Sequence, residues 1–210
     1  MNCKITDKDG RTHGGCQWGE GVRNTATGEG TELCTDGVIH YYADPLMAVF
    51  ANPIHGKYDP KTMILWEFEP DSEVNGDPLK KACKSGVTVK PIPIPEITTE
   101  QRVEIGIRAT KLGCNDKKWS KWADKWLSGK DRSADAAEAA WAAAWAAEAA
   151  DAAARAAAWA TEAAAWAAAW AAAEAAWAAA WAGIDILPII KQVLAPQGKE
   201  EKYRSKYLGK

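Results

Sequence analysis

Histidines, tyrosines and acids with possible catalytic or binding roles gather in the first third of this chain. A functional interpretation places His40, Tyr41 and Glu67 in one cleft for a small, nucleotide-like molecule. A structural interpretation, which the pattern favours, puts His40, Tyr41 and Tyr42 at the end of a strand, with one ring inside and one outside. No spacing here matches a metal site, a phosphate-binding loop or a catalytic triad. The sequence therefore assigns no catalytic residue, no metal ligand and no cofactor, and His40, Tyr41 and Glu67 remain candidate ligand contacts.

Glycines and cysteines form no recognisable site either. The glycines between positions 14 and 21 lie close together, but no helix start follows them, as a phosphate-binding fingerprint requires. The five cysteines are odd in number, scattered and without a C-x-x-C pair. This pattern argues against a disulfide framework or a zinc site, and it predicts reduced thiols in a cytoplasm.

The composition excludes further classes of function. The chain has 210 residues, a formal net charge of −2, and 12 Trp against two Phe. The near-neutral charge argues against nucleic acid as a partner. The first residues, Met1-Asn2-Cys3-Lys4, run into polar sequence without the pattern of a secretory signal.

Residues 1–114 are expected to form an α+β head. Strands are expected over 4–6, 32–34, 38–41, 63–69 and 87–92, and the prolines at the end of the last strand fit only a sheet edge. A short helix begins at Asp44-Pro45 and stops at Asn52-Pro53. A longer helix begins at Thr98 or Thr99, where Thr98 and Gln101 have capping-box spacing, and Gly113 ends it.

Residues 115–132 form a basic helix and a linker. Trp119, Trp122 and Trp126 recur at helical spacing and share one face, while the lysines lie off that face. The end of the chain, residues 184–210, is expected to be a short apolar helix followed by a basic tail.

Residues 133–183 are expected to form one long helix, because alanine dominates them and nothing breaks a helix. Its 49 residues from Ala134 to Ala182 would span about 74 Å. Seven tryptophans fall in a stripe about 60° wide, which we call the Trp seam. The Trp seam consists of Trp141, Trp145, Trp159, Trp166, Trp170, Trp177 and Trp181. Several of these tryptophans lie 11 residues apart, a period that keeps the stripe nearly straight.

The Trp seam needs a cover. A head of this size is only about 35 Å across, so a straight rod would overhang it and leave much of the stripe in water. We therefore expect a second copy of the chain, or another protein, along the seam. The alternative is complete covering within the chain by the basic Trp helix and residues 184–194.

Other interpretations of the rod are weaker. An ice-binding helix would repeat threonine, but only Thr161 is present. Stacking of single-stranded nucleic acid needs a positive groove, and carboxylates flank the seam. A membrane span is disfavoured because acids interrupt every window of about 20 residues.

Three stretches of the head together resemble an uncharacterised domain of bacteriophage and prophage proteins. They are Gly15–Gly21, Leu33–Leu46, which contains Cys-Thr-Asp-Gly-Val-Ile-His-Tyr-Tyr, and Leu65–Glu69, which reads Leu-Trp-Glu-Phe-Glu. Members of that family often carry alanine-rich tails with spaced aromatic residues. The resemblance implies a viral origin and a location in the host cytoplasm or the virion, and it brings no established activity.

Two functions follow as expectations. The first is a phage-type structural or interaction protein whose rod pairs with itself or with another virion or host protein. The second is a small-molecule or nucleotide-binding head, with a transferase-like enzyme as one form of it, and with the rod as oligomeriser. A deep cleft lined by His40, Tyr41 and Glu67 would favour the second, and dispersed polar residues would favour the first.

Overall fold

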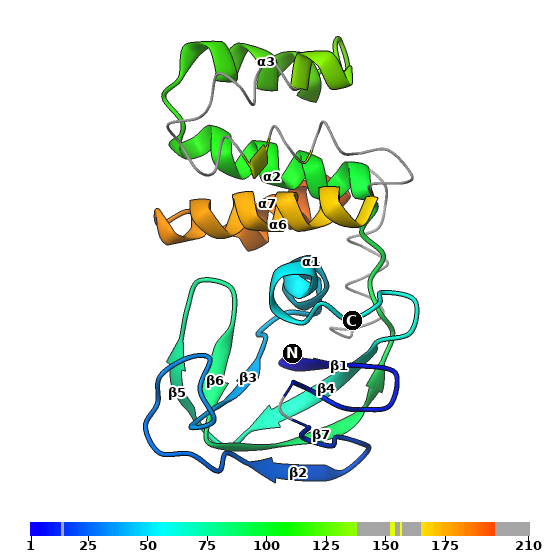
Figure 1. The fold of residues 1–210 in the computed structure, drawn as a ribbon, viewed down its shortest axis with the longest axis vertical. Helices are drawn as coiled ribbons and strands as arrows, with labels where there is room; N and C mark the ends of the chain where they lie inside the picture. Colours follow the sequence, from blue (N-terminus) through cyan, green and yellow to red (C-terminus); the bar gives the residue numbers. More distant parts are fainter. Residues whose placement is uncertain (14, 138–151, 154–155, 157–164, 196–210) are drawn as a thin grey trace. The chain divides into compact units, whose positions relative to one another are not determined.

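The computed structural model describes residues 1–13, 15–137, 152–153, 156 and 165–195 (Figure 1). The chain is α+β and divides into two compact units, one built on Met1–Glu96 and one on Ile97–Glu201. The expected head ended at residue 114, whereas the contact boundary falls between Glu96 and Ile97, because the helix that follows packs with later helices.

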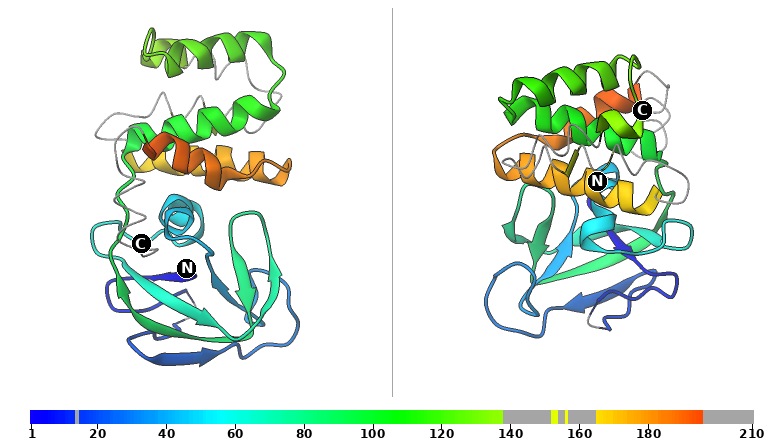
Figure 2. Two further views of the ribbon diagram at one scale, coloured as in Figure 1. Left: turned by 180° about the vertical axis from the view of Figure 1, so that it is seen from behind. Right: turned by 45° about the horizontal axis from the view of Figure 1, so that its top comes forward.

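The first unit consists of two antiparallel sheets and one helix. The four-stranded sheet has the order β1 (Cys3–Thr6), β4 (Ile64–Pro70), β7 (Ser85–Ile92) and β2 (Val22–Thr25). The three-stranded sheet has the order β3 (Ile39–Tyr41), β6 (Lys81–Cys83) and β5 (Glu73–Gly76). An isolated bridge between Cys3 and Tyr42 brings the start of β1 beside the end of β3. Figure 2 shows α1 (Pro45–His55) at one end of the curved pair of sheets, where it packs on β1.

Four of the five expected strands are confirmed, and one is wrong. Residues 32–34 form no strand: residues 33 and 34 lie in a turn, and Cys34 has a φ of 63°, outside the β region. The expectation that the prolines place the last strand at a sheet edge is wrong, because β7 lies between β4 and β2. Pro91 is nevertheless tolerated, because β2 pairs only with residues 85–88 and, among the described residues, one side of β7 has no partner strand at Pro91. β2, β5 and β6 were not expected, because they are short and lack a clear alternation of apolar residues.

Helix α1 begins as expected and ends later. The Asp44 side chain accepts a hydrogen bond from the Leu46 backbone N–H at 2.8 Å. The expected stop at Asn52-Pro53 is wrong, because the helix continues through Pro53 to His55. The backbone oxygen of Asn52 accepts from the N–H groups of Gly56 and Lys57, at 2.9 and 2.7 Å, which closes the helix one turn further on.

The second unit is helical. It contains α2 (Thr99–Gly113), α3 (Lys117–Leu127), α6 (Ala165–Trp181) and α7 (Ile186–Leu194). The capping box of α2 is present, because the Thr98 side chain accepts from Gln101 N–H and the Gln101 side chain accepts from Thr98 N–H. No helix among the described residues is long and apolar enough to cross a membrane.

The basic Trp helix is confirmed as α3, and its tryptophan face is buried. Trp119, Trp122 and Trp126 lie in one cluster with Val103 and Ile107 of α2. The same cluster contains alanines from the alanine-rich segment. The tryptophans of α3 are therefore covered by this chain itself.

Helix α6 packs through alanine rather than through tryptophan. Ala168, Ala171, Ala172 and Ala175 are buried, and the backbone of Ala172 lies so close to Gly106 of α2 that an added Cβ would be 3.1 Å from its oxygen. In the Trp seam, Trp170 is 44% exposed, Trp181 is 59% exposed, and Trp177 is half-buried. The seam members Trp141, Trp145 and Trp159 and the side chain of Trp166 lie outside the described residues.

The described residues between 133 and 183 do not lie along a single straight helix. Ala137, Ala152 and Ala172 belong to one buried cluster around α2 and α3. Along a straight helix, Ala137 and Ala172 would lie about 52 Å apart, whereas α2 is only about 22 Å long. Burial of alanine and tryptophan within one compact unit is favoured over a rod that would leave both in water.

Candidate functional site

The first unit contains a cavity of about 700 Å³. It is lined by residues from β1, from the end of β2, from β3, from the loops at 12–18, 26–27 and 34–38, from the end of α1 and from the turn before β6. The lining residues that carry chemistry are Lys4, His13, Cys16, Cys34, Asp36, His40, Tyr42, His55, Tyr58 and Lys80. Its volume lies in the range of small-molecule sites.

Lys4 is a buried cation in the wall of the cavity. Its side chain leaves β1, donates a hydrogen bond to the backbone oxygen of His40 at 2.8 Å, and lies 4.6 Å from the centroid of the Trp18 ring. Burial lowers the pKa of Lys4 to about 8, because the charged ammonium is poorly solvated there. Lys4 is therefore mostly protonated at pH 7, and its ammonium group is poorly solvated.

His40 and Cys34 are joined through the backbone. The N–H of Cys34 donates to Nε2 of His40 at 3.0 Å, so this nitrogen carries the lone pair and the ring is neutral. Burial, with smaller contributions from Lys80 and Lys4, lowers the pKa of His40 to about 4.

Lys80 is the second buried cation of the cavity. It is 8% exposed, and its Nζ donates to Sγ of Cys34 at 3.2 Å. The turn that carries Lys80 is closed by Asp77, whose side chain accepts from the N–H groups of Leu79 and Lys80, each at 2.8 Å. In the part of the chain that the structure describes, neither Lys4 nor Lys80 forms an ion pair with a carboxylate.

Tyr42 and His55 form a third part of the wall. The Tyr42 hydroxyl and Nδ1 of His55 are 3.2 Å apart, in hydrogen-bonding contact, and the two rings stack at 6.2 Å. Burial first, and then the charge of Lys80, lowers the pKa of His55 to about 4. Burial also raises the pKa of the Tyr42 hydroxyl, so both groups are neutral at pH 7.

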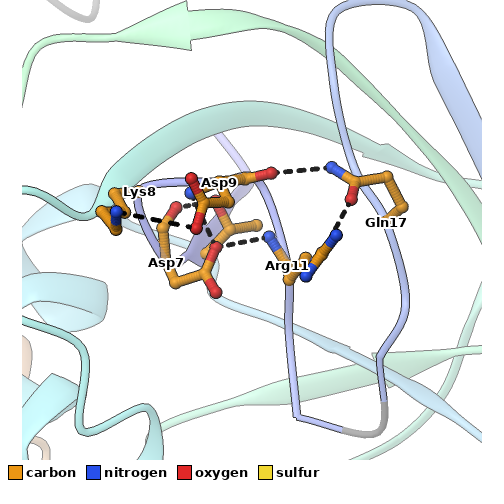
Figure 3. A network of polar contacts seen from close by, with 6 residues as sticks. Asp7, Lys8, Asp9, Arg11 and Gln17 are labelled. Carbon is orange, nitrogen blue, oxygen red and sulfur yellow. Dashed lines mark hydrogen bonds and ion pairs between the residues drawn. The ribbon is translucent and has the colours of Figure 1, made fainter.

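The rim of the cavity is shaped by the loop after β1. The Asp7 carboxylate accepts from the N–H groups of Asp9 and Arg11, and the Gln17 side chain joins Asp9 and Arg11 across the loop (Figure 3). These contacts place the following residues against the cavity. His13 then stacks on Tyr58 with ring centroids 5.3 Å apart, and its Nε2 is 2.7 Å from the oxygen of Gly56.

The structure brings one of the three predicted contact residues into the cavity. His40 lines it. Tyr41, the next residue on β3, is buried against Phe68 with ring centroids 5.5 Å apart. Burial first, and then Glu73, raises the pKa of Tyr41 to about 12. Glu67 lies on β4 outside the cavity, 3.5 Å from Lys90 in an ion pair.

The grouping of His40, Tyr41 and Glu67 is therefore not what the structure shows. Successive residues of a strand point to opposite faces, so His40 and Tyr41 cannot share a site through their side chains. Sequence reasoning missed Lys4, Cys34 and Lys80, which meet only because β1, the 28–37 loop and the turn before β6 fold together. The signal in the sequence for this site is the segment Leu33–Leu46, which contains Cys34, His40 and Tyr42 and carries part of the family resemblance.

The arrangement can bind an anion and present a thiol. Two cations are buried beside neutral histidines and hydroxyls, and Asp36 is the acid of the lining. The five cysteines are unpaired, and Cys34 is the exposed one among them. Among the described residues, no group of three or more His, Cys, Asp or Glu side chains could hold a metal ion.

Comparison with known proteins adds no relative to this picture: no family model, no curated protein and no solved structure matches the chain.

Proposed function

We propose that the first unit binds a small anionic molecule, such as a nucleotide, in the cavity beside Lys4 and Lys80. The observation that carries this proposal is the burial of both lysines, at 6% and 8% exposure, in the wall of one cavity. Placing a cation away from water without a counter-charge is costly, and a bound carboxylate or phosphate would offset that cost.

The neutral groups around the lysines suit such a ligand. His40, His55 and Tyr42 are uncharged at pH 7 and supply hydrogen-bonding groups without adding a negative charge. The stacked rings of His13 and Tyr58 stand at the rim, where an aromatic base could lie against them. The cavity therefore combines a positive interior with an aromatic edge.

Thermal unfolding of the full chain tests the proposal. AMP and inorganic phosphate are expected to raise the melting temperature, and adenosine, which lacks the phosphate, is expected to do so much less. At a concentration 100 times the dissociation constant, a ligand adds about 2.7 kcal/mol to the free energy of unfolding.

Two variants make the test specific. Lys80→Met removes the charge and keeps the length of the side chain, so it should abolish the shift by AMP. Lys90→Met, on an exposed lysine paired with Glu67 outside the cavity, should keep the shift. The proposal fails if millimolar AMP and phosphate leave the wild type unchanged, or if Lys80→Met responds as the wild type does.

A second candidate function is self-assembly through Trp170, Trp177 and Trp181, the members of the Trp seam whose side chains are described in α6. The observation that favours it is the outward position of Trp170 and Trp181, at 44% and 59% exposure, while the alanines of α6 are buried. Exposed aromatic stripes of this kind are common at interfaces between proteins. The occupant we propose is a second copy of this chain, in keeping with the expected structural role of a phage-type protein.

Mass photometry and light scattering measure this directly. A triple change of Trp170, Trp177 and Trp181 to Ala should convert an oligomer to a monomer without loss of helix. Leu112→Ala, which removes an exposed leucine of α2, should leave the mass unchanged. A monomeric wild type at micromolar concentration would exclude self-assembly.

A further inference from the structure

The structure contains a thiol in an unusual setting at the wall of the cavity. Cys34 is exposed, while Cys3 and Cys83 are fully buried. Burial raises the pKa of Cys3 well above its usual value and that of Cys83 to about 11, so these two thiols stay protonated and unreactive. Cys34 therefore differs from them in access and, as the following contacts show, in its charged neighbour.

The neighbour of the Cys34 sulfur is a buried cation. Nζ of Lys80 lies 3.2 Å from Sγ and donates to it, and Lys80 is only 8% exposed. A fixed positive charge against sulfur is the setting in which cysteine nucleophiles occur, because the thiolate is the attacking form.

The backbone around Cys34 is held in place from several sides. Cys34 has a φ of 63°, in the left-handed region that a side chain with a Cβ rarely adopts. Its N–H is held by His40, and Lys84 donates to the backbone oxygens of Gly30 and Gly37 on either side. The side chain of Asn75 also donates to the oxygen of Thr31 at 2.8 Å. The position of the sulfur next to Lys80 is thus determined by the surrounding chain.

We infer that Cys34 is a nucleophile that attacks an electrophilic carbon of a small anionic compound held in the cavity. The inference rests on the proposed anion site only for the charge of the compound. In the step, Sγ supplies an electron pair and forms a bond to carbon, and the bond from that carbon to its leaving group breaks. The leaving group departs with its electron pair, any thiol proton passes to solvent, and no oxidant or reductant is needed.

The charge of Lys80 selects for an anionic electrophile. An anion entering the cavity meets the ammonium groups of Lys4 and Lys80 beside the sulfur, and Asp36 is the opposing carboxylate of the lining. A negatively charged reagent should therefore react faster with Cys34 than a neutral reagent of the same size and mechanism. Iodoacetate and iodoacetamide are such a pair, and both transfer their carbon to sulfur with loss of iodide.

The experiment follows alkylation of the folded full-length chain, with the modified cysteine identified by peptide mass spectrometry. The reference thiol is Cys114, which is partly buried in the second unit. Cys34 is expected to react at least about tenfold faster than Cys114, with a rate ratio of iodoacetate to iodoacetamide above that of free cysteine. Lys80→Met should lower both the rate and the ratio, and Lys80→Arg should retain most of the ratio. Cys114→Ser serves as the matched control that leaves Cys34 alkylation unchanged.

The outcomes separate this inference from the anion site. If AMP stabilises the wild type and Cys34→Ser, but Cys34 reacts no faster than Cys114, the nucleophile is excluded and the anion site stands. If Cys34 reacts rapidly and Lys80→Met slows it, but AMP and phosphate have no effect on melting, the nucleophile stands and the anion site falls. An unchanged rate in Lys80→Met would overturn the role of Lys80.

Discussion

Lys80 donates a hydrogen bond from its ammonium group to the sulfur of Cys34 at 3.2 Å, across 46 residues of sequence. The cation belongs to the turn before β6, and the thiol belongs to a loop that precedes β3. This contact joins the two proposals for the first unit, because the same charge that would bind an anion also faces a nucleophile.

The loop around Cys34 depends on Lys84. Replacing Lys84 with Met removes the hydrogen bonds from its ammonium group to the backbone oxygens of Gly30 and Gly37. We expect a loss of about 1 to 3 kcal/mol in the free energy of unfolding, as for hydrogen bonds to charged groups. We also expect a slower alkylation of Cys34. Urea unfolding and the iodoacetate rate measure the two effects, and an unchanged rate would show that the loop does not need Lys84.

Acid should destabilise the protein through His40 and His55. Both pKa values are lowered from 6.5 to about 4, so the unfolded chain binds protons that the folded chain does not between these pH values. The free energy of unfolding should therefore fall as the pH drops from 6.5 to 4, by roughly 1 to 3 kcal/mol for each histidine. Urea unfolding at several pH values checks this, and His55→Gln should reduce the slope. An unchanged slope in that variant would contradict the assignment.

The tryptophans of α3 and α6 should differ in their energetic roles. Trp119 is fully buried in the second unit, and Trp119→Ala should cost about 3 to 5 kcal/mol through lost contacts and a cavity. Trp181 contacts Trp177 edge to face and is otherwise largely in water, so Trp181→Ala should cost about 1 kcal/mol or less. Chemical unfolding at equal concentration compares the pair, and equal costs would contradict the placement of α3 in the core.

Close packing of α2 and α6 should depend on Gly106. A Cβ at this position would lie 3.1 Å from the oxygen of Ala172 and 3.3 Å from its Cα, and both are backbone atoms that cannot turn away. Gly106→Leu should therefore destabilise the protein by about 1 to 3 kcal/mol or more, despite the better helix propensity of leucine. Leu112→Ala, at an exposed position on the same helix, should have little effect. A stable Gly106→Leu variant would show that the two helices can separate at low cost.

The features of the fold that could be predicted are those set by residues a few positions apart in the sequence. The Asp44 cap of α1 and the capping box of Thr98 and Gln101 involve residues two or three positions apart, and both are present. Trp119, Trp122 and Trp126 share a face because the period of a helix places them there, and this too is present. Pro53 is an exception, because a proline usually ends a helix but α1 continues through it to His55. Hydrogen bonds from the N–H groups of Gly56 and Lys57 to the oxygen of Asn52 close the helix after the proline.

Of the three residues that the sequence predicts as ligand contacts, only one lies in the cavity. His40 lies in the cavity as expected, but Tyr41 points away from it on the other face of β3, and Glu67 pairs with Lys90 elsewhere. Side-chain direction on a three-residue strand depends on which face the sheet buries, and that choice is made by pairing with β6, 40 residues later.

The helix caps, the helical faces and most of the strands follow from the sequence alone, since each depends on neighbours along the chain. The spacing of Trp170, Trp177 and Trp181 also placed these three residues on one face of α6. Which side of α6 is buried depends on packing against α2, because close approach at Gly106 favours small alanines over bulky rings. Only the tertiary structure placed Lys4, Cys34, His40 and Lys80 around one cavity, since strand pairing and loop closure join residues that no local period connects.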